Sequence, residues 1–150
     1  GHLQAQLKNE LTAINQYFLH YRMLKHWGFG KLAKKEYEES MGEMKHADML
    51  MDRIFMLDGL PNLQDIAKIN VGETVPEILA CDLGAEQGAQ ATVKAGMAHC
   101  ESVGDYVSRD LLKKILIDTE EHIDFLETQI ELIDKVGLQN YQQSQMGELG

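Results

Sequence analysis

The chain has few cysteines, few basic residues and no long apolar run, and each of these shortages argues against a class of protein. Its 150 residues include no run of about 18 apolar residues, so we expect no segment that spans a membrane. They also include only two cysteines and two prolines. Only 14 basic residues stand against 24 acidic ones, and the resulting formal charge of −10 argues against nucleic acid as a partner. Cys81 and Cys100 fall nineteen residues apart in one expected helix and cannot bridge each other there. We therefore expect reduced cysteines and a cytoplasmic protein.

Apolar residues recur instead at alternating steps of four and three, which is the spacing of helices with one buried face. Between the second and third helices, about a dozen residues without helical period, bounded by Pro61 and Pro76, are expected to form one long crossover. The sequence thus predicts an all-α fold, a four-helix bundle in a single domain over residues 1–150. The expected helices are read from Leu3 to Leu24, from about Lys31 to Leu57, from the capping residue Thr74 to Cys100, from after Gly104 to Val136, and, as a short fifth, from Leu138 to about Gln145.

One pair of polar residues interrupts the apolar face of the second helix. Glu43 and His46 are three residues apart, so they share a helix face, and the apolar pattern assigns that face to the core. A buried acid beside a buried imidazole needs a partner, and a metal ion is an efficient one. Taken alone, the same spacing is more often a solvated pair.

An internal repeat strengthens the metal interpretation. A shift of 76 residues brings three pairs into register: Glu10 with Glu86, His46 with His122, and Glu43 with Thr119. The sequence then predicts two similar helical hairpins. The first helix of each offers one carboxylate, and the second helix offers a pair of positions three residues apart, which is the arrangement of di-iron carboxylate bundles. Five candidate ligands and one gap result: the ligands are Glu10, Glu43, His46, Glu86 and His122, and the gap is Thr119.

Four segments of the sequence carry a resemblance to a known family: 9–17 (NELTAINQY), 43–48 (EMKHAD), 59–65 (GLPNLQD) and 137–141 (GLQNY). They resemble the bacterioferritins, the haem-carrying branch of the ferritins. The resemblance implies a ferritin-like four-helix bundle with one long crossover and a short fifth helix, assembled into a hollow 24-subunit cage that stores ferric iron. It also implies a di-iron ferroxidase centre inside each subunit and a haem b shared between two subunits.

Carried over by position, the family's iron ligands fall on the same five residues, with Glu43 and Glu86 as bridges. The sixth falls on Thr119, where the family usually has glutamate, and a neutral hydroxyl is a much poorer ligand for a hard cation. Asp118 lies nearer the ligand face than its acidic neighbours and offers a shifted or water-bridged contact. Met44 is rotated about 100° from the iron face and, by resemblance, is the axial haem ligand that each of two symmetry-related chains provides.

Three functions from different classes follow. The first is iron storage and detoxification by a cage subunit that oxidises ferrous iron with dioxygen or peroxide and binds haem, with a ferredoxin as one candidate reductant for release. The second is a haem-bearing subunit whose ferroxidase centre Thr119 impairs and which co-assembles with an active second subunit type. The third is a di-iron peroxide reductase that stores no iron. The absence of rubredoxin-like cysteine pairs argues against this function.

Two further expectations concern residues around the ligand set. Tyr17 lies on the same helix face as Glu10, where it is either an electron donor or hydrogen-bond partner to the metals or a core packing residue. The remaining histidines have no partner at ligand spacing and are expected at the surface or at interfaces: His2, His20, His26 and His99.

Overall fold

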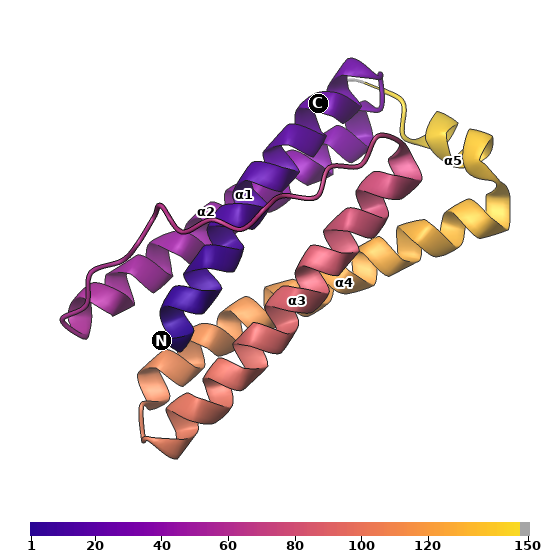
Figure 1. Cartoon of the computed structure of the whole chain (residues 1–150). Coiled ribbons are helices and arrows are strands. Elements are labelled where there is room, and N and C mark those ends of the chain that lie inside the picture. Colours follow the sequence, from indigo (N-terminus) through magenta and orange to yellow (C-terminus); the bar gives the residue numbers. More distant parts are fainter. Residues whose placement is uncertain (148–150) are drawn as a thin grey trace.

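A computed structural model describes residues 1–147, which form five helices (Figure 1). No strand and no helix able to cross a membrane is found among these residues. The all-α bundle with a short fifth helix, predicted from the sequence, is confirmed. The helices are α1 (His2–His26), α2 (Gly30–Met56), α3 (Val75–Ser102), α4 (Tyr106–Val136) and α5 (Leu138–Ser144).

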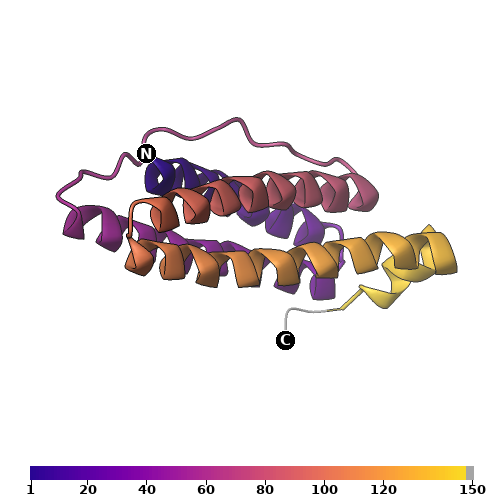
Figure 2. The same ribbon diagram turned by 90° about the horizontal axis from the view of Figure 1, so that it is seen from below.

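The four long helices form two hairpins joined by the crossover. α1 packs on α2, α3 packs on α4, and the hairpins meet mainly where α1 contacts α3. The crossover, residues 57–74, runs the length of the bundle over α1 and α3 (Figure 2), so α2 and α3 run in the same direction. It follows α1 through regularly spaced hydrogen bonds, which join Asn62 to Gln4, Ala67 to Thr12, Asn70 to Gln16 and Gly72 to His20.

Side-chain caps start the two helices of the second hairpin. Thr74 Oγ1 accepts a hydrogen bond from the Glu77 backbone N–H at 3.3 Å, and Pro76 occupies the first turn of α3, where its missing N–H costs nothing. Asp105 accepts from the Ser108 backbone N–H at 3.1 Å and also from Arg53 Nη2 at 2.9 Å. The α4 cap therefore ties the start of that helix to α2.

The core consists of two apolar clusters with a polar band between them. One cluster, around Leu7, Leu50 and Ile115, fills the end of the bundle near the N-terminus. The other, around Leu24 and Leu126, fills the opposite end, where α5 inserts its buried Tyr141. Charged and polar side chains occupy the length between them on all four helices, and burial of so many carboxylates requires compensating partners.

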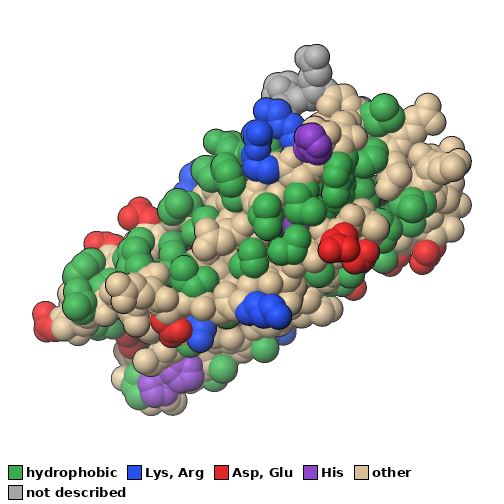
Figure 3. Space-filling view, turned by 45° about the horizontal axis from the view of Figure 1, so that its top comes forward, with side chains coloured by type: hydrophobic (Ala, Val, Ile, Leu, Met, Phe, Trp, Pro, Cys, Tyr) green, Lys and Arg blue, Asp and Glu red, His purple; other side chains and the backbone are tan. Residues whose placement is uncertain are grey.

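Apolar side chains also reach the outer surface. On the face that carries α1 and the crossover they extend along most of the molecule (Figure 3). The crossover exposes Leu60, Leu63, Ile66 and Val71, and α1 and α2 expose Phe18, Tyr37 and Met44. Exposed apolar area of this extent is typical of protein surfaces that bind other subunits.

Candidate metal centre

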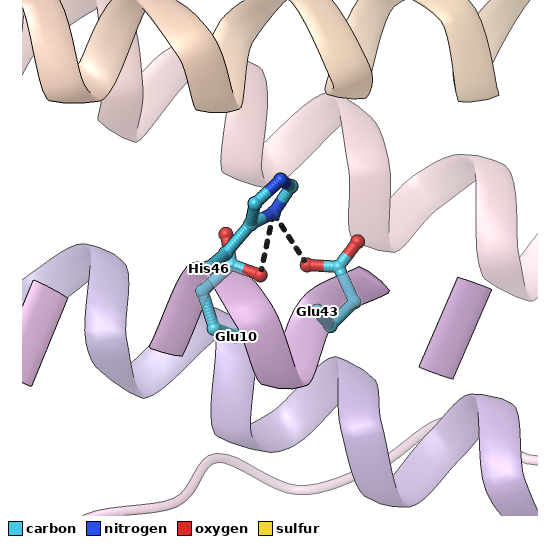
Figure 4. A group of neighbouring side chains, drawn as sticks. All are labelled: Glu10, Glu43 and His46. Atoms are coloured by element: carbon cyan, nitrogen blue, oxygen red, sulfur yellow. Dashed lines mark ion pairs between the residues drawn. The ribbon is translucent and has the colours of Figure 1, made fainter. Parts of the chain in front are cut away.

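The polar band contains all five candidate ligands, and the first three lie together. Glu10 on α1 and Glu43 and His46 on α2 point toward one another (Figure 4). His46 Nδ1 lies 3.4 Å from Glu10 Oε2 and 3.6 Å from Glu43 Oε2. One ligand atom from each residue lies within 4.8 Å of the other two, and all three side chains are buried. This spacing suits a single cation coordinated by two carboxylates and an imidazole.

The other two candidates come from the second hairpin. Glu86 on α3 and His122 on α4 are buried and in contact, with 3.0 Å between His122 Nδ1 and Glu86 Oε1. The Tyr17 hydroxyl donates to the same Glu86 oxygen at 2.6 Å, and its ring meets the His122 ring edge-on at 5.4 Å between centroids. Tyr17 is thus a direct hydrogen-bond partner of one candidate ligand. The structure brings the five residues from four helices into one band.

Two buried atoms of the first group have no hydrogen-bond partner. Glu10 Oε2 and His46 Nδ1 both face the space between the three side chains, where they lie 3.4 Å apart, and neither has a hydrogen-bond partner of good geometry within the described residues. Their other atoms are held: Gln6 Nε2 donates to Glu10 Oε1 at 2.7 Å, and Asp118 Oδ2 lies 2.7 Å from His46 Nε2. Buried polar atoms without partners are rare, and a cation between them would satisfy both.

Asp118 determines which histidine nitrogen is free for a metal. Because its carboxylate accepts from Nε2–H of His46, Nδ1 is the nitrogen that a metal could use, as in the carboxylate–histidine–metal arrangement. Burial alone would lower the pKa of His46, but hydrogen bonds and charge from Glu10 and then Asp118 outweigh it and raise the pKa to about 9. Burial raises the pKa of Glu10, while His46 and Gln6 act in the opposite direction. The metal-free centre therefore holds protons that a cation would replace.

Thr119 is buried at the position the repeat assigns to a sixth ligand. Asp118, which the sequence suggested as its substitute, is engaged instead with His46, on the side of the ring away from the other ligands. The acidic residue that does reach the Thr119 side is Glu39, with Oε2 at 3.4 Å from His122 Nδ1. The sequence contained a signal for it, since Glu39 precedes Glu43 by four residues and so shares its face.

A second buried polar cluster corrects the expectation for His20. This residue is fully buried, with Nδ1 at 2.9 Å from Asp82 Oδ1, and not on the surface. Its Nε2 accepts from the Gly72 backbone N–H at 3.0 Å, so the ring hydrogen is on Nδ1 and is donated to Asp82. Glu36 completes the cluster, and burial followed by repulsion from Asp82 raises its pKa well above the usual value. With both His20 nitrogens already used, this cluster holds protons and offers no imidazole to a metal.

Met44 lies outside the bundle with its side chain 48% exposed. Tyr37, two turns earlier on the same face of α2, is also exposed, and its ring packs near that of Phe18 on α1 at 6.3 Å. A thioether on an apolar outer surface is available to a soft or haem iron, and it cannot reach the polar band inside.

Comparison with known proteins finds relatives that match most of the chain. The model of the ferritin-like domain family matches residues 1–136. A bacterioferritin of Brucella melitensis is 50% identical over 134 residues, covering 89% of this chain and 83% of the relative. Bacterioferritin BfrA of Mycobacterium tuberculosis is 49% identical over 139 residues, covering 93% and 87%, and a bacterial ferritin of Synechocystis is 50% identical over 145 residues, covering 96% and 93%.

Proposed function

This chain belongs to the bacterioferritins of the ferritin family, and from that membership we propose that it is an iron-storage subunit that oxidises ferrous iron at a centre inside its own bundle. The observation that carries the proposal is the pair of buried atoms without partners, Glu10 Oε2 and His46 Nδ1, which face each other and Glu43 at metal-ligand spacing. Glu86 and His122 would contribute to a second position beside the first, with Glu43 and Glu86 shared between the two.

In this mechanism the protein's residues bind the substrate ions and manage protons. Two ferrous ions are the substrates, and each gives one electron to dioxygen, which becomes hydrogen peroxide by taking up two protons; peroxide is the alternative acceptor. The carboxylates neutralise the cations, and Asp118 holds the His46 ring with Nδ1 inward. Tyr17 holds Glu86 through its 2.6 Å hydrogen bond. Protons leave His46 and Glu10 when the ions enter, because metal ligands must be deprotonated.

We also propose that Met44 binds haem b together with Met44 of a second copy of the chain. The thioether is exposed on an apolar stretch of α2 and α1, so a soft sulfur ligand and an apolar surface that would suit a macrocycle lie together. Haem bound there would supply one-electron transfer chemistry. Because one chain offers one such methionine, the site would be complete only when two copies of the chain meet, in keeping with a closed cage of many subunits in the cytoplasm.

Anaerobic titration with ferrous iron, followed by exposure to dioxygen, tests the proposed centre. We expect two tightly bound ions per chain and their oxidation together when dioxygen is added. Light scattering on the same sample checks the assembly, which should be far larger than a monomer or dimer of about 17 to 34 kDa. A chain that binds no ferrous iron tightly, or that stays monomeric, contradicts the proposal.

Thr119 favours one alternative. A buried threonine in place of a carboxylate removes charge from the second position, so the chain could serve as a haem-bearing subunit with an impaired centre that co-assembles with an active subunit type. In that case the titration should saturate at one tight ion per chain. Mixing with a second, fully liganded subunit should then restore rapid oxidation.

A further inference from the structure

Glu39 lies where the second metal position lacks a ligand. Its carboxylate, on the turn of α2 before Glu43, has Oε2 at 3.4 Å from His122 Nδ1. One ligand atom each from Glu39, Glu43 and His122 lies within 4.8 Å of the others. These three residues therefore form a group of the same chemistry and spacing as Glu10, Glu43 and His46.

The two groups share Glu43. Two metal positions that share one bridging carboxylate are the arrangement expected of a dinuclear carboxylate site. The first group also has two buried atoms without partners aimed into it, which independently indicates that the band accepts cations. Glu39 thus adjoins a centre for which there is separate evidence.

Neighbouring residues fix the direction of the Glu39 carboxylate. Lys35, one turn earlier on α2, pairs with Glu39 Oε1 at 3.0 Å, and its ammonium lies 4.6 Å from the centre of the Phe125 ring on α4. Because Lys35 holds Oε1, Oε2 is the oxygen that faces His122. The side chain is only about one-fifth exposed, so it is largely excluded from solvent.

Other acids near Thr119 are committed elsewhere or face outward. Asp118 is bonded to His46 Nε2, on the far side of that ring. Glu120 is exposed and accepts from Gln90 at 3.1 Å, and Glu121 is exposed. Of the acids on α4 beside Thr119, none reaches His122, whereas Glu39 does so from α2.

We propose that Glu39 replaces the carboxylate missing at Thr119, so that the second metal position is completed from α2 and not from α4. This inference rests on the proposed function, since it concerns the same centre. Glu10, Glu39, Glu43 and Glu86 together carry four negative charges, which two divalent ions neutralise. The ligand set is then four carboxylates and two imidazoles, as the repeat would give with glutamate at position 119.

Cobalt(II) titration of the assembled full-length chain tests this without relying on oxidation. Visible absorption reports cobalt held by protein ligands, and the end points count ions per chain. We expect two tight ions in the wild type. Glu39→Gln, which keeps the shape of the side chain but removes its charge, should weaken the second ion at least ~10-fold and leave the first unchanged.

Three further variants make the result specific. Glu38→Gln removes the same charge from an exposed neighbour on α2 and should behave as the wild type. Thr119→Glu should change the wild type little, because the position already has its carboxylate. Combined with Glu39→Gln, it should restore the second ion, which also shows that loss in the single variant is not misfolding.

The outcomes separate this inference from the proposed function. Two equally tight ions in both wild type and Glu39→Gln would overturn the role of Glu39 while leaving the centre in place. One tight ion in the wild type, raised to two by Thr119→Glu, would also overturn it and would support the impaired-subunit alternative. No tight ion in any variant would refute the centre itself, and the role of Glu39 with it.

Discussion

Protons and metal ions should compete for His46, and this competition can be measured. In the metal-free chain Glu10 and Asp118 raise the pKa of His46 to about 9. The ring is therefore doubly protonated at pH 7, with one hydrogen on Nδ1, the nitrogen that faces Glu10 and Glu43. An ion entering the first position must displace that hydrogen, because only a neutral imidazole is a ligand.

The magnitude follows from this pKa. Between pH 6 and pH 8, both below about 9, the ion that enters the first position releases one proton from His46, so its affinity should rise ~10-fold per pH unit. The total is ~100-fold, or ~3 kcal/mol. Stability of the metal-free protein should change in the opposite direction. A raised histidine pKa contributes stability that is fully present below pH ~6.5 and is lost as the pH rises through about 9.

Calorimetric titration with zinc at pH 6, 7 and 8, in two buffers of different ionisation heat, measures both affinity and proton release. Asp118→Asn is the informative comparison, because removing that charge should lower the pKa of His46 and flatten the pH dependence near pH 8. A zinc affinity that is constant from pH 6 to 8, with no proton released, would show that the ring is neutral in the metal-free state and refute this account.

Three other substitutions have defined outcomes. Met44→Leu keeps an apolar side chain of similar size but removes the sulfur, so haem content, measured by absorption, should fall to nearly nothing while the assembly and its iron binding persist. Glu36→Gln should stabilise the metal-free chain progressively more as the pH rises from 5 to 8, by at most ~1.4 kcal/mol per pH unit, which thermal unfolding measures. The reason is that a carboxyl whose pKa is raised in the folded state destabilises that state at every pH above the pKa of the unfolded chain. Tyr17→Phe removes the 2.6 Å hydrogen bond to Glu86 and should cost ~1.5–3 kcal/mol, seen as a lower melting temperature in chelator.

Each of these has a contrary result. Undiminished haem in the methionine variant would show that another residue binds the haem. A stability difference for Glu36→Gln that is the same at every pH would mean that this carboxyl ionises normally beside Asp82. An unchanged melting temperature for Tyr17→Phe would show that its hydroxyl bond to Glu86 contributes nothing net.

The sequence predicted the fold well because its periodic and capping signals are local. The steps of four and three set the buried faces, and Thr74 with Pro76 marked the start of α3 at the right residue. The 76-residue repeat also aligned Glu10 with Glu86, and both side chains are buried in the polar band. These inferences need only the geometry of single helices.

Contacts between helices were harder to predict. His20 gave no signal of its partner, because Asp82 lies 62 residues away and is brought to it by α1 meeting α3. Asp118 was expected near the gap at Thr119, yet a rotation of one residue along α4 aims it at His46 instead. Glu39 lies on the same face of α2 as Glu43, which the sequence could show. Its approach to His122, however, depends on how closely α2 and α4 pack.

The division into two hairpins has a consequence for how the chain holds together. Glu10, Glu39, Glu43 and His46 belong to the first hairpin, whereas Glu86 and His122 belong to the second. The two halves pack against each other through shared apolar clusters, but the crossover is their only covalent link. Cations bound between them would add a second link, much as a disulfide closes a long loop. Such a link can be removed and replaced without chemistry on the chain. If a protease cleaves a subunit within residues 57–74, the two pieces should therefore stay associated while metal is bound and dissociate more readily when a chelator removes it.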